Sequence, residues 1–216
     1  MLTTPELLEP LARLRTNEVV VTTMAPTRPW GRLSDHDLDF ASADSAMGHA
    51  ADLALGVALA RPERRVVCLN GDGSMLMSLG TLVTAAASGA ENLVLVVLEN
   101  GTYEITGNQP VPGAGAVDWV GLARAAGFPV AERFSQAAAW AAALPRLLSA
   151  AGPVFAAVAM APGEQGPIGR SAGEEARYLR TSLADWSRQF RAALGVEGLP
   201  VSHCPENFRP GRVVEP

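Results

Sequence analysis

The 216-residue chain is long enough for one large domain or for one and a half small ones, and it contains 48% hydrophobic and 18% charged residues. Its formal net charge of −5, without any cluster of Lys or Arg, argues against nucleic acid or an anionic membrane as a partner. No apolar run approaches the ~18 residues of a membrane span, and the N-terminus lacks the apolar core of a signal peptide, so we expect a cytoplasmic protein. Two cysteines are too few for a disulfide framework or an iron–sulfur subunit.

Five segments are predicted before the central part of the chain. They are a helix over 4–15, a strand over 18–24, a loop over 25–31, a strand over 38–42 and a helix over 50–60. The loop is expected because Pro26 and Pro29 interrupt it. Within the loop, Arg28 is either an exposed arginine or a contact for an anionic group of a substrate.

The central part of the chain has the pattern of a strand, a helix and a second strand. An apolar run over 66–69 stops at the tetrapeptide Gly-Asp-Gly-Ser at 71–74, and a second apolar run over 92–98 ends just before Asn100. Between them, apolar residues recur three or four apart at Met75, Leu76, Leu79, Leu82 and Val83. Such a segment forms a right-handed βαβ unit with buried parallel strands. It brings Asp72 and Asn100 together in the crevice where open α/β sheets bind ligands.

The residue types at this crevice suit a metal ion that is bound to a diphosphate. The two glycines of the tetrapeptide have no Cβ, so backbone amides can approach a bulky anion. A helix that begins near Ser74 directs its free N–H groups to the same place. Asp72 offers an anionic oxygen and Asn100 a neutral amide oxygen. With a carbonyl of the turn at 101–102 and two phosphate oxygens, they make most of an octahedral Mg²⁺ shell.

Beyond Asn100 the alternation continues, and residues 103–109 are expected to wrap over the diphosphate. The remaining predicted elements are a loop over 110–115, a helix over 118–126, a strand over 128–131, a helix over 135–150 and a strand over 154–160. We therefore expect an α/β fold with an open parallel sheet and helices on both of its faces.

The C-terminal part differs from the rest, and we expect a division into a domain over 1–165 and an extension over 166–216. The extension is predicted to contain an amphipathic helix over 174–194 and an extended tail over 195–216. The apolar stripe of that helix consists of Leu179, Leu183, Trp186, Phe190 and Leu194. This stripe is expected to pack on the chain's own domain, with a partner subunit as the alternative.

The motif pair resembles that of the thiamine-diphosphate-dependent enzymes, which carry GDG, a spacer of about 25 residues and then Asn. The segments MGHAADLALGVALARPERRVVCLNGDGSMLMSLGTL and ENGTYEITGNQP are similar to those of sulfopyruvate decarboxylase β subunits and phosphonopyruvate decarboxylases. The resemblance covers residues 19–170 and includes a PxGR-like stretch at 167–170. Rival motifs fit less well. A dinucleotide motif needs glycine at Leu76, and the G-x-S-x-G match at 169–173 follows a Pro/Gly loop instead of a buried strand.

The resemblance implies a set of contacts to thiamine diphosphate and Mg²⁺. It implies that the carbonyl of Ser45 accepts from the 4′-amino group, that Met47 is the apolar wedge that bends the cofactor, and that Gly48 lets the ring pass. The other implied cofactor contacts are Gly71, Asp72, Gly73, Ser74, Asn100, Thr102 and Tyr103, and the implied metal ligands are Asp72, Asn100 and Thr102. Tyr103 or Ile105 is expected to line the pocket. His49 either takes part in catalysis by orienting the substrate or only caps a helix.

The resemblance also implies half of an active site. In these enzymes the glutamate that activates the cofactor belongs to a pyrimidine-binding domain, for which this sequence has no room before its first predicted strand. We therefore expect a β-type subunit in an α₂β₂-like assembly that decarboxylates a 3-substituted pyruvate, such as sulfopyruvate or phosphonopyruvate, to an aldehyde and CO₂. The alternatives are a carboligase subunit of the acetolactate-synthase type and a non-catalytic, cofactor-binding or regulatory subunit.

Overall fold

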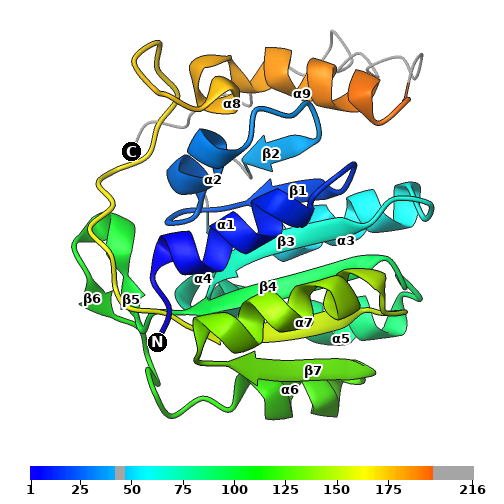
Figure 1. The fold of residues 1–216 in the computed structure, drawn as a ribbon, viewed down its shortest axis with the longest axis vertical. Helices are drawn as coiled ribbons and strands as arrows, with labels where there is room; N and C mark the ends of the chain where they lie inside the picture. The colour runs from blue at the N-terminus through cyan, green and yellow to red at the C-terminus, as the bar shows by residue number, and fades with distance from the viewer. Residues whose placement is uncertain (42–46, 197–216) are drawn as a thin grey trace, which may run out of the picture.

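A parallel sheet of six strands forms the centre of the molecule (Figure 1). The computed structural model describes residues 1–41 and 47–196. In sheet order, the strands are β2 (Asp39–Ala41), β1 (Val19–Thr22), β3 (Val66–Gly71), β4 (Leu93–Glu99), β8 (Val154–Ala159) and β7 (Val130–Phe134). Every neighbouring pair runs parallel. The chain builds β2 on one side of β1 and β3 on the other, so a topological switch point lies between β1 and β3.

Helices cover both faces of this sheet (Figure 1). One face carries α1 (Thr4–Leu14), α2 (Thr27–Leu33) and α7 (Ala137–Ser149), and α1 packs against the other two. The opposite face carries α3 (Ala50–Ala60), α5 (Thr81–Ala87) and α6 (Trp119–Ala126), and α5 packs against the other two. The predicted α/β fold with an open parallel sheet between two helical layers is confirmed. In the part of the chain that the structure describes, no helix is long and apolar enough to cross a membrane.

The central strands β3, β4 and β8 are uniformly apolar because helices cover both of their faces. Every residue of β8 is buried, and in β3 and β4 only the last residue is partly exposed. Those last residues, Gly71 and Glu99, lie at the carboxyl edge of the sheet. These three strands are therefore closed to solvent along their length, and β3 and β4 become accessible at the edge where the polar motifs follow.

The N-terminal segment runs beside the carboxyl end of β8. Leu2 is buried and forms a parallel bridge with Met160, and its N–H donates to the carbonyl of Ala159 (2.7 Å). A capping box follows, in which the side chains of Thr3 and Glu6 each accept from the other's backbone N–H. These contacts fix the first turn of α1 next to the carboxyl edge of the sheet.

The prediction of a loop over 25–31 is wrong in part, because α2 occupies most of that segment. Pro29 is the third residue of α2, and a proline in the first turn removes no intrahelical hydrogen bond. Trp30 is fully buried and donates from Nε1 to Asp39 Oδ1 on β2 (2.9 Å). The helix is therefore stabilised by tertiary packing, which the local sequence pattern does not reveal.

The helix predicted after β3 is divided into two helices. The first, α4 (Asp72–Met77), begins earlier than expected, and a turn over 78–80 separates it from α5. Because the turn interrupts the helix, the helical spacing predicted for the whole segment does not hold across it. Leu82 is buried as expected, whereas Val83 is exposed.

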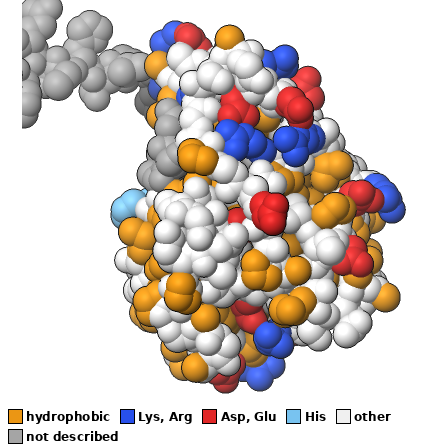
Figure 2. Space-filling view, turned by 90° about the vertical axis from the view of Figure 1, so that its left-hand side faces the viewer, with side chains coloured by type: hydrophobic (Ala, Val, Ile, Leu, Met, Phe, Trp, Pro, Cys, Tyr) orange, Lys and Arg blue, Asp and Glu red, His pale blue; other side chains and the backbone are white. Residues whose placement is uncertain are grey.

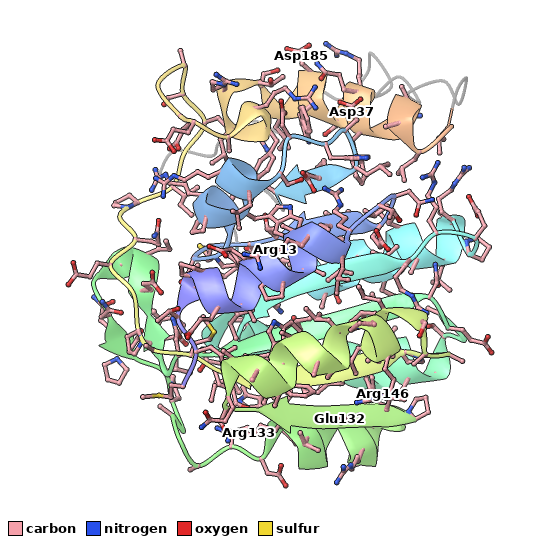
Figure 3. All side chains as sticks on the ribbon, in the orientation of Figure 1. Arg13, Asp37, Glu132, Arg133, Arg146 and Asp185 are labelled. Atoms are coloured by element: carbon pink, nitrogen blue, oxygen red, sulfur yellow. The ribbon has the colours of Figure 1, made fainter. Side chains whose placement is uncertain are left out.

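The edge strand β7 overlaps the strand predicted over 128–131 at Val130 and Ala131 and extends to Phe134. The extension includes Glu132 and Arg133, and edge strands commonly carry charged residues. Glu132 Oε1 binds Arg146 Nη1 of α7 (2.8 Å), and Arg133 Nη2 binds Glu99 Oε2 at the end of β4 (2.7 Å); Figure 3 labels Glu132, Arg133 and Arg146. The charged residues of β7 are thus held by neighbouring elements.

The prediction of a single helix over 174–194 is wrong, because the segment forms α8 (Arg177–Arg180) and α9 (Leu183–Ala193). Ser182 separates the two helices and caps α9, since its side chain accepts from the N–H of Asp185 (3.1 Å). A hydroxyl at this position competes for the backbone and favours a helix start over a helix interior.

The apolar side of α9 packs on the chain's own sheet, as expected. Trp186 Nε1 donates to the carbonyl of Asp39 (2.8 Å), and the ring centroids of Phe190 and Phe40 are 4.9 Å apart. In Figure 1, α8 and α9 cover the β2 edge of the sheet. The division of the chain after residue 165 stays a prediction, and residues 197–216 of the predicted tail lie outside the described residues.

Candidate functional site

The carboxyl ends of β3 and β4 bring the two predicted motifs into direct contact. Gly71 at the end of β3 is in register with Leu98 of β4, so the residues that follow both strands emerge side by side. The N–H of Gly101 donates to Asp72 Oδ2 (2.8 Å). The segment that carries Asn100 is therefore hydrogen-bonded to the aspartate of the Gly-Asp-Gly-Ser tetrapeptide.

Asp72 is a buried carboxylate with few partners. Its side chain is held by two backbone N–H groups, those of Gly73 (2.8 Å to Oδ1) and Gly101, and the residue is 4% exposed. Burial raises the pKa of Asp72, the two backbone hydrogen bonds oppose this shift, and the charge of Glu99 adds to it. No arginine forms an ion pair with Asp72 in the described part of the chain. A divalent cation beside Asp72 would supply the missing positive charge.

Asn100 is held in one orientation by contacts at both ends of its amide. Its Nδ2 donates to Glu104 Oε2 (3.2 Å), and its Oδ1 accepts from the N–H of Thr102 (3.1 Å). Since an amide oxygen has two lone pairs, Oδ1 retains the capacity to bind a cation. Within residues 1–41 and 47–196, no group of three or more His, Cys, Asp or Glu side chains could hold a metal. A metal here would also need amide, carbonyl or ligand oxygens, as Mg²⁺ sites commonly use.

One pocket at the carboxyl edge gathers most of the predicted site residues. The predicted residues in its lining are Met47, Gly71, Asp72, Gly73, Ser74, Asn100, Thr102, Tyr103 and Ile105. The rest of the lining is Thr4, Met24, Ala25, Pro26, Leu98, Glu104, Thr106, Met160 and Ala161. Figure 2 shows this side of the molecule, where hydrophobic and uncharged side chains dominate the central area and most charged side chains lie toward the rim.

The two glycines of the tetrapeptide differ in what surrounds them. No atom lies within 4 Å of a Cβ built on Gly71, so the space above it is open. A Cβ on Gly73 would overlap the Tyr103 ring and lie 2.9 Å from Val111 Cγ2. The expectation that both glycines clear space for an anion therefore fits Gly71, whereas Gly73 makes room for the Tyr103 ring.

Gly48 and Ser74 connect the predicted wedge to the tetrapeptide. The N–H of Gly48 donates to Ser74 Oγ (2.9 Å), and its carbonyl accepts from the Ser78 hydroxyl. Gly48 has a φ of +88°, which favours glycine. This hydrogen bond fixes the backbone next to Met47, which lines the pocket. Ser45, the predicted acceptor for the 4′-amino group, lies outside the described residues.

His49 and Arg28 are not brought into the pocket. The His49 side chain is 78% exposed and its Nδ1 lies 3.0 Å from Asp52 Oδ2, so a catalytic role for it stays a prediction that this geometry does not support. Arg28 binds Glu174 and donates to the carbonyls of Gly166 and Pro167 (3.0 and 2.7 Å). The hypothesis that Arg28 meets an anionic group of a substrate is likewise not supported, because its guanidinium is already bound.

Two of the lining residues that were not predicted from the sequence have unusual surroundings or backbone geometry. Glu104 lies in a short 3₁₀ turn (Glu104–Thr106) and is 8% exposed, although an acidic residue in a polar loop is expected to face solvent. Met24 follows β1 with a φ of +57°, which is unusual for a residue with a side chain. The sequence signal for Glu104 is its place four residues after a predicted metal ligand. The signal for Met24 is its place after a strand that borders the switch point.

Residues 32–158, more than half of the chain, match the family model described as "Thiamine pyrophosphate enzyme, C-terminal TPP binding domain". The chain belongs to this family. The resemblance inferred from the tetrapeptide and Asn100 is thereby confirmed, and the matched segment includes both motifs.

Relatives of two lengths match this family member. It is 40% identical over 169 residues to sulfopyruvate decarboxylase subunit beta of Methanothermobacter thermautotrophicus, which covers 76% of this chain and 84% of that one. It is 37% identical over 174 residues to phosphonopyruvate decarboxylase of Streptomyces viridochromogenes, over 81% of this chain but only 41% of that one. The thiamine diphosphate-dependent 4-hydroxybenzoylformate decarboxylase of Rhodococcus jostii RHA1 shares the fold, with a TM-score of 0.64 and 24% identity over 76% of this chain and 33% of that one.

Proposed function

We propose that this chain is the β-type subunit of a two-subunit thiamine-diphosphate-dependent 2-oxoacid decarboxylase. Its substrate is a 3-substituted pyruvate such as sulfopyruvate or phosphonopyruvate, and its products are an aldehyde and CO₂. The observation that carries the proposal is the buried carboxylate of Asp72, which no described cation neutralises and which Gly101 joins to the segment bearing Asn100. Family membership and 84% coverage of a relative named as a β subunit support it further.

The residues present fit the cofactor and its metal. Asp72 and Asn100 Oδ1, with the carbonyl of Thr102, would hold Mg²⁺, because carboxylate, amide and carbonyl oxygens are its preferred protein ligands. The open space above Gly71 would admit the diphosphate. Met47 lies in the same pocket and would support the bend between the two rings. The bound cofactor would supply the electron sink that decarboxylation needs.

This chain's own residues would bind and orient the cofactor and exclude water. The pocket lining is largely apolar, which strengthens electrostatic interactions within it. Because burial raises the pKa of Asp72, a bound cation would favour the ionised form of this carboxylate. Binding the cofactor and binding the metal would therefore reinforce each other.

The glutamate that activates the cofactor would come from a separate pyrimidine-binding subunit in an α₂β₂-like assembly. The purified chain is expected to show little or no decarboxylation of sulfopyruvate or phosphonopyruvate, and the companion subunit is expected to restore it. Release of CO₂ and formation of aldehyde are the measurements. Robust turnover by the single chain would refute the two-subunit proposal, and an acyloin product would indicate a carboligase instead.

Asp72→Ala tests the cofactor site directly. Isothermal titration of thiamine diphosphate into the reconstituted protein with Mg²⁺ is expected to show loss of binding for this variant, because the anionic metal ligand is gone. Asp35→Ala is the matched control, since this aspartate is exposed and pairs with Arg177 outside the pocket lining. Unchanged affinity in Asp72→Ala would count against the site. Cofactor binding without turnover in the reconstituted wild type would indicate a regulatory subunit.

A further inference from the structure

Glu104 is a buried acidic residue in the pocket to which the proposed function gives no role. Both of its carboxylate oxygens accept hydrogen bonds: Oε2 from Asn100 Nδ2 (3.2 Å) and Oε1 from the N–H of Gln165 (3.1 Å). It thus connects the predicted metal ligand to the segment over 161–166 that follows β8. We call this segment the strap.

The strap closes tightly over the Glu104 carboxylate. A Cβ on Gly163 would lie 2.5 Å from Glu104 Oε1, so the backbone of the strap approaches the carboxylate as closely as only glycine permits. Asn108 Nδ2 donates to the carbonyl of Gly163 (2.9 Å), which is a further hydrogen bond that holds the strap. This close packing removes Glu104 from bulk water, which makes its two hydrogen bonds more costly to lose.

The contact with Glu104 determines which end of the Asn100 amide is available to a ligand. A carboxylate only accepts hydrogen bonds, so the NH₂ group of Asn100 must face Glu104, and rotation of the amide would set two oxygens against each other. The N–H of Thr102 selects the same orientation, because it donates to Asn100 Oδ1. The oxygen that can bind a cation is therefore directed away from Glu104 before any ligand arrives.

We propose that Glu104 is a positioning residue that fixes the Asn100 amide for Mg²⁺ and makes this orientation depend on the strap. The inference rests on the proposed function, since it assumes that Asn100 binds the metal of the cofactor site. Partners of this kind, which orient a metal ligand without touching the metal, strongly affect metal affinity.

Glu104→Gln tests the proposal because glutamine has only one side-chain oxygen. In the wild type, Asn100 and Gln165 donate to different oxygens of Glu104. In the variant an NH₂ group replaces one of these oxygens, so one of the two donors faces another donor. In the reconstituted protein, the Mg²⁺ concentration that half-saturates thiamine diphosphate binding, measured by calorimetry, is expected to rise roughly ten- to a hundredfold. Glu164→Gln is the matched control, because it removes the same charge from an exposed position on the strap.

The double variant Asn100→Asp with Glu104→Gln exchanges donor and acceptor and preserves both contacts. The glutamine NH₂ then donates to the aspartate, and its oxygen still accepts from the N–H of Gln165. We expect each single variant to melt below the wild type, by roughly 2–4 °C per broken contact, and the double variant to melt above either single variant. This readout needs no cofactor.

Each outcome supports or overturns the inference. A raised Mg²⁺ requirement in Glu104→Gln, a normal one in Glu164→Gln and a higher melting temperature in the double variant support it. Unchanged Mg²⁺ dependence in Glu104→Gln, or a double variant that melts no higher than the single ones, overturns it and leaves the proposed function intact. If the reconstituted wild type shows no Mg²⁺-dependent cofactor binding, the proposed function fails and the inference fails with it.

Discussion

Asp39 and Asp72 are both buried aspartates, but their carboxylates have different partners. Asp39 is 0% exposed and accepts from Trp30 Nε1 (2.9 Å), Ser34 Oγ (2.5 Å) and the N–H of His36 (3.3 Å), and it pairs with Arg15 (2.8 Å). Asp72 has only two backbone N–H partners and no cation among the described residues.

The contrast separates a structural carboxylate from one prepared for a ligand. The partners of Asp39 satisfy both of its carboxylate oxygens, and Arg15 neutralises its charge, so nothing remains for an external cation. The partners of Asp72 orient its carboxylate and leave its charge uncompensated. Burial alone therefore does not identify a functional carboxylate, whereas burial without charge compensation does.

Asp39→Ala should have the largest effect on stability. It leaves the Arg15 guanidinium buried without its counter-charge, and removal of one partner from a buried ion pair costs about 3–5 kcal/mol. Urea unfolding followed by tryptophan fluorescence measures the free energy of unfolding. Asp35→Ala, at an exposed position, should change it by less than about 0.5 kcal/mol. A cost for Asp39→Ala below about 1 kcal/mol would show that this network is not structural.

Gly73→Ala should have an intermediate effect on the free energy of unfolding, whereas Gly71→Ala should have none. The new Cβ at Gly73 would overlap the Tyr103 ring, and overpacking of this kind costs about 1–3 kcal/mol. Gly71 has open space around it and a φ of −75°, so its alanine variant should unfold like the wild type and only weaken cofactor binding. Equal unfolding free energies for the two variants would contradict the different surroundings of these glycines.

Glu174→Gln should have a smaller effect on the free energy of unfolding, and this effect should depend on pH. Hydrogen bonds from Arg28 lower the pKa of Glu174, so the stabilisation is fully present above the ordinary glutamate pKa of about 4.3 and is lost as pH falls through the lowered value. The variant should lose about 1–2 kcal/mol at pH 7, and the difference from the wild type should shrink below about pH 4. Urea unfolding at several pH values tests this, and a difference that grows on acidification would contradict it.

Asp72→Ala should have the smallest effect on stability, within about 1 kcal/mol. It removes two hydrogen bonds to backbone N–H groups but also removes a buried, uncompensated charge, and the two changes oppose each other. The same urea unfolding experiment, carried out without cofactor, measures the effect. A loss as large as that in Asp39→Ala would remove the distinction between the two aspartates.

The sheet was predictable because its central strands are continuous apolar runs and because strand and helix patterns alternate along the chain from residue 66 onward. The predicted helix boundaries were wrong where a tertiary contact or a capping residue overrides the apolar pattern. Trp30 anchors α2 despite Pro29, and Ser182 interrupts an apolar stripe that continues through both α8 and α9. A stripe of apolar residues predicts which side is buried, but it does not predict that the backbone remains helical between them.

The site was predictable to the extent that strand ends determine it. Asp72 and Asn100 follow adjacent parallel strands, so the topology alone brings them together. The Tyr103 ring over Gly73 and the burial of Glu104 depend on side-chain packing across distant segments, which no spacing in the sequence encodes.

Both edges of the sheet are unsuited to joining a strand from another molecule. At β2, the Asp39 carbonyl is bound by Trp186, and α9 covers the edge with its aromatic side. At β7, Glu132 and Arg133 carry charges along the open edge. Intermolecular β-augmentation is thereby discouraged, and such charged or covered borders also protect against fibrillar aggregation. Among the described residues, the helical layers and the end of the sheet at which the pocket opens are the surfaces left for contacts with other chains.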